Sequence, residues 1–383
     1  ASYSLTADRG PDNVTNSTVI MKAYNPYRVF STDKETGEYI QYLENKNLTY
    51  EKKHELNLGV DAGFLNNRID MTFDWYRRNN YDLIGPVNTE GVGGQVIEYA
   101  NMASMKSHGE ELSISTKNIK TKDFGWTTDF IFSHNKNEVT KLLAQSETMD
   151  LIKGAGFTKK GYPVRSLFSI PFKGLTSEGY PTFLTETGEV TSSDINFQSL
   201  NTDYLKYEGP TDPTITGSLG NIFTYKGFRL NVYVTYSFGN KVRLDPKYSP
   251  YYNDLTSMTK DFKNRWEVPG DETKTNVPVI LSYREYKANN ELSYGYGAYN
   301  YSDMRVAKGD FIRMKEISFG YDFPKSLLRG SHLTNMSLQL QATNLFLLYA
   351  DSKLNGQDPE FFNSGGVAAP VPKQCTLTLR VGL

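Results

Sequence analysis

The feature that most constrains this chain is a two-residue hydrophobic period that continues for about ten residues at a time. From Glu55 to Phe64, apolar side chains occupy every second position, and polar residues or glycines occupy the others. After the short sequence Leu65–Asn67, the same pattern resumes from Arg68 to Tyr76. Successive side chains of a strand point to opposite faces. Each segment therefore predicts a strand with one apolar and one polar face, and the two together predict a hairpin.

The alternation recurs along the chain in about eleven segments. These lie near residues 1–8, 17–24, 55–64, 68–76, 107–117, 126–133, 213–225, 228–238, 310–323, 336–343 and 376–383. Some connections are short, near 65–67, 118–123, 225–227 and 324–333, whereas others are long and polar, near 25–49, 79–106, 136–212, 239–309 and 348–372. Tilted strands of about ten residues, with short turns on one side and long loops on the other, are typical of outer-membrane barrels. We therefore predict an all-β fold, a transmembrane antiparallel β-barrel.

Composition excludes several other classes of protein. The 42 Lys and Arg residues balance 43 Asp and Glu, so no basic field favours nucleic acid. We find no apolar run of about 18 residues that could span a bilayer as a helix. The single cysteine, Cys375, permits no internal disulfide. Because the chain begins at Ala1 inside what reads as a strand, we expect the N-terminal part of a larger protein to precede it.

A soluble β-sandwich or propeller, as in a binding or adhesion protein, is the alternative interpretation of the alternation. Strands in such folds average about five or six residues, and their long loops do not gather on one side. One segment departs from the pattern, because Arg313 and Lys315 share a face with Ile317, Phe319 and Tyr321. Either a β-bulge turns the two cations inward, or they contact lipid phosphates at the outer rim.

Several sequence blocks resemble, in the same order, those of SusC/RagA-type TonB-dependent outer-membrane transporters. They are 50–76 with 81–84, 101–112, 265–271, 302–324, 342–346 and 356–360, and they extend over most of the chain. Two positions depart from the family pattern. Lys106-Ser-His-Gly109 stands where the family has Asn-Lys-Gly, and the last residue is Leu383 where the family has Phe.

The resemblance implies that residues 1–383 are the C-terminal half of the barrel, about eleven strands of a 22-stranded plugged barrel. It implies import of large nutrients across the bacterial outer membrane, in contact with outer-membrane lipid and lipopolysaccharide. Energy would come from the TonB-ExbB-ExbD complex through an N-terminal plug region that is absent from this sequence, and a SusD-like surface lipoprotein would act as a lid. Oligosaccharides are the expected substrates and oligopeptides the alternative; a passive porin is a competing interpretation.

The sequence contains no recognisable enzyme motif, so we expect neither catalysis nor a cofactor. Glu110 and Glu111 are adjacent and would face opposite sides of a strand, which prevents them from flanking one glycosidic bond. The histidines lack zinc-site spacing. Residues 154–161 lack the ending of a phosphate-binding loop, and residues 351–360 have Lys353 where a calcium site needs a ligand. No metal site is expected.

The long loop 239–309 is the most informative segment for binding, because its tyrosines are set among Asn, Ser and Gly. Tyr provides a rigid apolar surface with a polar tip, and this composition is typical of adaptable recognition surfaces. Together with residues 146–212, the loop is predicted to contact the substrate or the lid. The alternative is that its aromatic residues pack the loops against one another. The candidate residues are Trp266, Tyr283, Tyr286, Tyr294, Tyr296, Tyr299 and Tyr301.

Overall fold

The computed structural model describes residues 1–10, 20–24, 37–42, 44–45, 47–88, 97–251, 255, 257–330, 332–362 and 372–382. Its main element is one antiparallel sheet in which ten strands follow the order β1-β4-β5-β6-β7-β13-β14-β17-β18-β19. These strands are β1 (Ser2–Asp8), β4 (Glu51–Phe64), β5 (Ile69–Asn88), β6 (Ile97–Lys120), β7 (Phe124–Leu142), β13 (Ile215–Tyr225), β14 (Phe228–Phe238), β17 (Phe311–Asp322), β18 (Asn335–Ala350) and β19 (Gln374–Gly382). The predicted all-β antiparallel sheet is confirmed.

The short turns form where the sequence supplies residues that accept a left-handed backbone. Between β4 and β5, Leu65, Asn66 and Asn67 have φ of 54°, 56° and 58°. Asn tolerates this conformation better than most residues. Between β13 and β14, Lys226 and Gly227 have φ of 45° and 88°, which is the pattern of a tight hairpin turn with positive φ at both central positions. The hairpins predicted on either side of these turns are confirmed.

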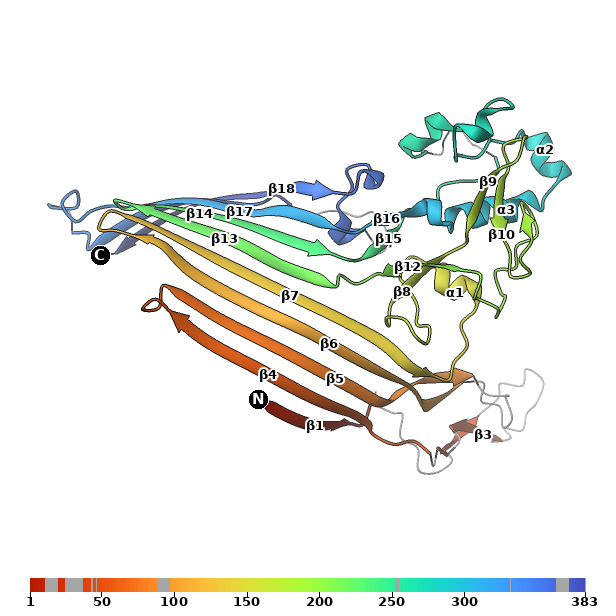
Figure 1. The fold of residues 1–383 in the computed structure, drawn as a ribbon, viewed down its shortest axis with the longest axis horizontal. Coiled ribbons are helices and arrows are strands. Elements are labelled where there is room, and N and C mark those ends of the chain that lie inside the picture. Colours follow the sequence, from red (N-terminus) through yellow and green to blue (C-terminus); the bar gives the residue numbers. More distant parts are fainter. Residues whose placement is uncertain are drawn as a thin grey trace, which may run out of the picture.

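All the short turns lie at one end of the sheet, together with the C-terminal end of β19 (Figure 1). The long connections lie at the opposite end, where they carry the small sheets and helices. We call the two ends the turn end and the loop end. The arrangement follows from antiparallel order, because strands that pair in sequence put alternate connections at opposite ends.

Two features of the strands differ from the sequence-based expectation. Residues 20–24 form β2 (Ile20–Tyr24), which pairs with β3 (Gly37–Tyr42) in a separate sheet and adds no strand to the main one. β5 and β6 extend to Asn88 and from Ile97, well into the predicted loop 79–106, because ladder pairing continues there without apolar alternation. Some of the predicted segments include residues that lie outside the described ones, namely 17–19, 25–36, 89–96, 363–371 and Leu383.

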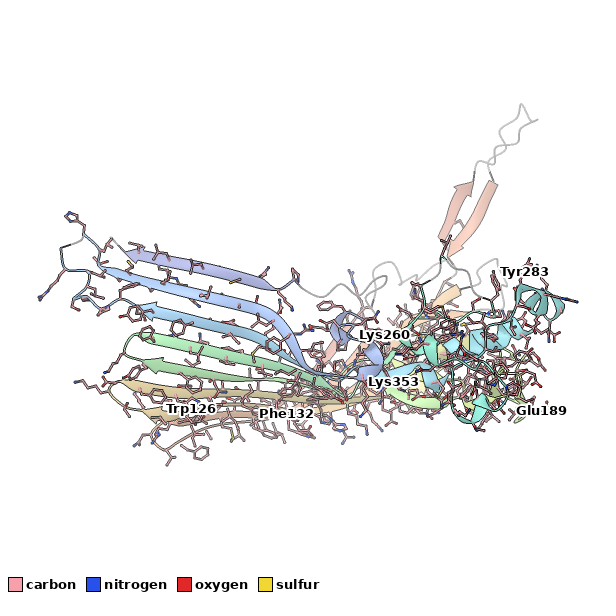
Figure 2. The ribbon with its side chains drawn as sticks, turned by 90° about the horizontal axis from the view of Figure 1, so that it is seen from above. Trp126, Phe132, Glu189, Lys260, Tyr283 and Lys353 are labelled. Atoms are coloured by element: carbon pink, nitrogen blue, oxygen red, sulfur yellow. The ribbon has the colours of Figure 1, made fainter. Side chains whose placement is uncertain are left out.

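Cross-strand register gives the sheet one apolar and one polar face. Directly opposed residues share a face, and one such row runs through Val60, Phe73, Leu112 and Phe132. The apolar face is open: Val60 is 55 % exposed and Leu379 on β19 is 58 % exposed. In Figure 2, Trp126 and Phe132 lie on this face, away from Lys353.

The loop end is built from short elements inserted between the long strands. They are α1 (Thr148–Ile152), β8 (Ser166–Ser169), β9 (Phe172–Leu175), β10 (Pro181–Leu184), β11 (Val190–Thr191), β12 (Lys206–Pro210), β15 (Lys241–Arg243), α2 (Tyr283–Ala288), α3 (Leu292–Asn300) and β16 (Val306–Lys308). Short 3₁₀ helices join them: η2 (Lys260–Asn264), η3 (Asp271–Thr273), η4 (Asp303–Arg305), η5 (Ser352–Leu354) and η6 (Pro359–Phe361). We call residues 143–212 and 239–309 together the loop region.

A β-bulge interrupts β17 at Lys315. On the β14 side, Glu316 pairs with Tyr233 and Met314 with Val234, so Lys315 has no opposite residue. The bulge reverses the alternation, because Arg313 lies on the polar face with Thr235 whereas Ile317 lies on the apolar face with Val232. The sequence allowed either a bulge or a contact of the two cations with lipid phosphates, and the bulge is confirmed.

Three tyrosines lie directly opposite glycines in the sheet: Tyr76 faces Gly109, Tyr236 faces Gly217 and Tyr233 faces Gly220. Each ring covers its glycine, so a Cβ added at Gly109 would lie 2.5 Å from the hydroxyl oxygen of Tyr76. The Tyr236 hydroxyl also donates to the carbonyl of Ile131, 2.9 Å away. The missing side chains make room for the rings to lie flat on the sheet.

Candidate functional site

The two parts of the loop region share one hydrophobic core. Leu151 and Ile152 of α1 and Phe168 of β8 pack with Tyr248 and with Tyr299 of α3. The shared core joins the connection after β7 to the connection after β14. The loop region is therefore a folded unit at the loop end of the sheet (Figure 1).

Arg243 is the buried hub of this unit. It is 5 % exposed, and its guanidinium donates to the carbonyl oxygens of Ile152 (3.2 Å), Ser302 (2.7 Å) and Phe168 and to the hydroxyl of Ser169 (3.1 Å). Burial lowers the pKa of Arg243 to about 10, because desolvation disfavours the charged form. Its planar fork of donors ties three segments together in a way that a single ammonium could not.

Three of the seven predicted binding residues are buried in the loop region. Trp266 donates from its indole nitrogen to Glu272 at 3.1 Å, and its ring covers Gly179. The hydroxyl of Tyr296 donates to the carbonyl of Val279. Tyr299 packs edge-on against the rings of Phe172 and Tyr248. Burial raises the pKa of both phenols, Tyr296 and Tyr299.

The other four predicted residues are at least partly exposed. Tyr283 is 63 % exposed and Tyr294 is 52 % exposed. Tyr286 is half-buried, and its ring centroid lies 4.8 Å from that of Tyr251. Tyr301 is half-buried against Phe197. Whether any of the seven contacts a substrate or a lid stays a prediction.

Tyr294 lines an open cavity of about 730 Å³ in the loop region. The same cavity is lined by Asp194, Asn196, Gln198 and Glu291, whose carboxylates and amides offer hydrogen bonds beside an exposed aromatic ring. Of the seven predicted residues, Tyr294 is the one that this cavity brings next to other polar side chains from a distant part of the chain.

A second cavity, of about 600 Å³, lies where the loop region meets the polar face of the sheet. We call it the wall cavity. Its walls include the hydroxyls of Thr216, Thr235 and Ser237 from β13 and β14 and the side chains of Arg165 and Asp212 from the loop region. Arg165 and Asp212 pair at 2.7 Å. This cavity was not predicted from the sequence. The cations that break the alternation in β17 were a possible signal of it, because Lys315 at the bulge lines the cavity.

The segment 351–362, which follows β18, is anchored to the sheet by a buried ion pair. One guanidinium nitrogen of Arg313 lies 2.6 and 2.7 Å from the two carboxylate oxygens of Asp358 and 3.1 Å from Glu360. Side chains of Arg313 and Asp358 are 5 % and 7 % exposed. Lys315 instead donates to the side-chain oxygen of Asn344 at 2.8 Å. The bulge therefore directs both cations to protein partners.

The described residues hold no group of three or more His, Cys, Asp or Glu side chains that could bind a metal ion. In that part of the chain, no helix is both long and apolar enough to cross a membrane. Glu110 and Glu111 lie on opposite faces of β6, and Glu110 instead contacts His134 at 2.7 Å. The carboxylate of Asp351 accepts hydrogen bonds from the backbone of Lys308 and Lys353.

No protein-family model matches the chain. Among curated proteins, it is 26 % identical over 375 residues to TonB-dependent receptor P3 of Formosa agariphila, covering 94 % of this chain and 35 % of that protein. It is 30 % identical over 356 residues to TonB-dependent receptor SusC of Bacteroides thetaiotaomicron, covering 88 % of this chain and 32 % of that protein. The chain thus spans about a third of the length of these curated relatives.

Among solved structures, the fold is similar to the RagAB peptide transporter, with a TM-score of 0.75 and 23 % identity over 99 % of this chain and 40 % of that one. The RagAB peptide importer in its 'open-open' state gives a TM-score of 0.77 and 22 % identity, covering 100 % of this chain and 39 % of that one. The likeness extends over the sheet and the loop region alike, because nearly the whole chain is aligned.

Proposed function

Because the sequence and the fold of this chain are those of a SusC/RagA-type TonB-dependent transporter, we propose that it forms part of the barrel and of the outer mouth of a nutrient importer in the bacterial outer membrane. Its described strands would form the transmembrane wall, and the loop region would face the outside of the cell. Energy for import would come from TonB-ExbB-ExbD through an N-terminal plug region of the full-length transporter.

The open apolar face is the observation that carries this proposal. Leu219, Phe319 and Leu340 are 41 %, 48 % and 47 % exposed, although they lie in the middle of long strands. Each Å² of such surface left in water costs roughly 25 cal/mol, so a face of this kind needs a cover. Lipid provides that cover, and the antiparallel ladder pairs most of the backbone groups within the sheet, as a hydrocarbon environment requires.

An aromatic cluster at the turn end supports a membrane interface there. Trp126 stacks on Phe223 with ring centroids 5.7 Å apart, and Phe228 stacks on Phe319 at 5.6 Å and lies 4.4 Å from Tyr321. Amphipathic aromatic rings prefer the boundary between hydrocarbon and water, and transmembrane barrels carry girdles of them. Because short turns lie on the periplasmic side of bacterial barrels, the turn end would face the periplasm.

The polar face suits a large substrate that binds through many hydrogen bonds. Its hydroxyl groups come from Ser113, Thr216 and Thr235, and several charges on it are neutralised locally, as in the pair of Arg78 and Glu55 at 3.0 Å. A wall of paired charges and hydroxyls offers hydrogen bonds to sugar hydroxyls without a strong field. We favour oligosaccharides as the imported nutrient, with oligopeptides as the alternative.

A SusD-like surface lipoprotein is the partner that we propose for the loop end. Tyr283 and Tyr294 are exposed on α2 and α3, and Tyr251 lies beside Tyr286 on the same region. Exposed tyrosines on a folded support are suited to binding a protein, because they bury large area at small entropic cost.

The experiment expresses the full-length transporter with its neighbouring lipoprotein in the native host and measures uptake of labelled oligosaccharides and of oligopeptides of similar mass. We expect uptake that stops when TonB is deleted, heat-modifiable migration of the purified transporter and co-purification of the lipoprotein. Uptake of oligopeptides but not of oligosaccharides would make oligopeptides the substrate class. Uptake that persists without TonB would indicate a passive porin, and solubility without detergent would overturn the membrane assignment.

A further inference from the structure

A third cavity, of about 290 Å³, lies in the loop region beside the segment 351–362. We call it the cationic cavity. It is lined by residues 244–247 after β15, by residues 257–261 that lead into η2, and by the segment around Lys353. None of these residues lines the wall cavity. The volume lies just below the range of about 300–1,000 Å³ that is typical of small-ligand sites, which suits a single small group.

Arg305 is a buried cation that lines this cavity and is only partly compensated. It is 3 % exposed. One terminal nitrogen donates to the carbonyl of Asp245 at 3.1 Å, and the other lies 3.8 Å from the carboxylate of Asp261, too far for a strong hydrogen bond. Its Nε has no hydrogen-bond partner within the described residues. A buried guanidinium with unfilled donors is costly, and an anion would offset that cost.

Three lysines surround Arg305 in the same cavity. Lys247 and Lys260 are exposed, and neither makes an ion pair or a side-chain hydrogen bond with the part of the chain that the structure describes. Lys353 donates to the carbonyl of Val306 at 3.2 Å, which leaves its charge without a carboxylate partner among those residues. Figure 2 shows Lys260 and Lys353 together in this region.

The charges in the cavity do not cancel. Two acidic side chains, Asp245 and Asp261, line it with four cationic ones, which are Lys247, Lys260, Arg305 and Lys353. Asp261 is 46 % exposed, so solvent screens part of its charge, whereas the guanidinium of Arg305 is held in a poorly solvated position. A single oxyanion at the cavity would gain from all four cations.

From this geometry we infer that the cationic cavity binds one oxyanion, a carboxylate or a sulfate ester, carried by the nutrient that enters the transporter. The inference rests on the proposed import function and narrows its substrate class to oligosaccharides with acidic groups, or to a peptide carboxylate in the alternative. Arg305 would provide the fixed, directional contacts, and the exposed lysines would close around the anion from the solvent side.

The test is protection of single lysines from acetylation in the full-length transporter, purified with its lipoprotein in detergent. The protein is treated with an acetylating reagent in sodium sulfate, in sodium glucuronate, in neutral glucose and in sodium chloride, all adjusted with sodium chloride to one ionic strength. Mass spectrometry then follows Lys247 and Lys260. Lys263 is the matched control, because it is exposed on η2 yet does not line the cavity.

We expect sulfate or glucuronate to slow acetylation of Lys247 and Lys260 at least about threefold, because a bound anion holds the amines in their unreactive protonated form. Lys263 should react at the same rate in every solution. Protection by sulfate alone would identify a sulfate ester as the group, and protection by glucuronate alone would identify a carboxylate. Glucose should not protect.

Arg305→Gln should remove the protection while the variant keeps the heat-modifiable migration of the parent. Equal rates for all lysines in all four solutions would overturn the inference, as would equal protection of Lys263. TonB-dependent uptake is measured in parallel in cells of the native host that produce the same transporter and lipoprotein. Uptake without protection would reject the anion subsite and leave the import function intact, whereas protection without uptake would reject import and leave the subsite.

Discussion

Arg313 holds Asp358 through one guanidinium nitrogen that lies 2.6 and 2.7 Å from the two carboxylate oxygens. The pair joins a bulged strand of the sheet to the segment 351–362. That segment contributes Lys353 to the cationic cavity and Glu360 to the wall cavity, so it separates the two. One buried ion pair therefore fixes the partition between both cavities.

Removing one partner of this pair should release the segment. In Asp358→Asn, Arg313 loses its buried carboxylate and keeps only the half-exposed Glu360 at 3.1 Å, so we expect a loss of stability of up to about 3–5 kcal/mol. We expect new proteolytic cleavage within 351–362 and altered uptake. Lys274→Ala is the control, because its pair with Asp271 is 74 % exposed on the lysine side and should contribute less than about 1 kcal/mol. Unchanged cleavage in Asp358→Asn would show that the pair does not anchor the segment.

A side chain at Gly109 should interfere with assembly of the sheet. In Gly109→Val, the new Cβ would meet the backbone carbonyl of His134 and the phenol of Tyr76, and a backbone carbonyl cannot move aside cheaply. We expect a smaller fraction of heat-modifiable, folded protein in the membrane. Gly320→Ala is the matched strand control, since its nearest neighbour would lie at an ordinary 3.6 Å. Equal folded fractions in both variants would contradict this account.

Charge should be tolerated on one face of β13 and not on the other. Leu219→Arg places a cation on the apolar face, where the cost at the middle of a bilayer is about 2–4 kcal/mol. Ser218→Arg places the same residue on the polar face one position away. We expect poor insertion of the first variant and normal insertion of the second, measured as folded protein in outer-membrane fractions. The reverse order would mean that the faces are assigned the wrong way round.

The exposed and buried tyrosines should behave differently when they are truncated. Tyr283→Ala and Tyr294→Ala remove exposed rings, so we expect weaker binding of lipoprotein or substrate with the loop region still folded. Tyr296→Ala and Tyr299→Ala remove buried rings and should cost about 3–5 kcal/mol, as aromatic core truncations do. Binding assays and limited proteolysis distinguish the two effects. Normal binding by both exposed-site variants would remove these residues from the proposed contact surface.

Alkaline pH should unfold the loop region. Burial holds the pKa of Tyr296 and Tyr299 above the ordinary value of 10.0, so above that pH the unfolded chain releases protons that the folded chain retains, and stability falls. Arg243 opposes this change, because its pKa in the folded chain is about 10, below the ordinary 12.5. Between these pH values the folded chain releases a proton that the unfolded chain retains, so this group raises the free energy of unfolding. The two phenols together outweigh the single guanidinium.

The measurement is absorbance of phenolate at 295 nm during a pH titration. We expect a late cooperative step that coincides with loss of proteolytic resistance in the loop region. Tyr296→Phe should make the step smaller, and Tyr283→Phe, which changes an exposed ring, should leave it unchanged. A step of the same size in both variants would indicate that the buried phenols do not report on unfolding.

Where alternation was present, it predicted the strands and their faces, because the polarity of each residue from Glu55 to Phe64 indicates the face on which it lies. The extension of β5 and β6 into residues 79–106 was not predicted, because alternation is absent there. The bulge at Lys315 was also predictable, since one extra residue in the strand is what moves Arg313 and Ile317 to opposite faces. The short pair β2 and β3 was not, because strand propensity alone does not specify which strand is the partner.

The loop region could not be derived in the same way. Its core brings Phe168 against Tyr299, and its hub joins Arg243 to Ile152, contacts between residues that are far apart in the sequence. Local composition does not indicate which distant residues pack together. Aromatic content therefore indicated six tyrosines and Trp266 equally, although Tyr296 and Tyr299 pack inward while Tyr283 and Tyr294 face solvent. The cationic cavity was missed for the same reason.

The strand order has a consequence for how proteins of this kind can diversify. β7 is followed in the sheet by β13, and β14 by β17, although the loop region is inserted in the chain between the members of each pair. The inserted residues leave and return at neighbouring strands. Evolution can therefore lengthen, shorten or replace the inserted residues without disturbing the register of the main sheet. The same sheet can then acquire new ligand preferences while its strands still pair in the same order.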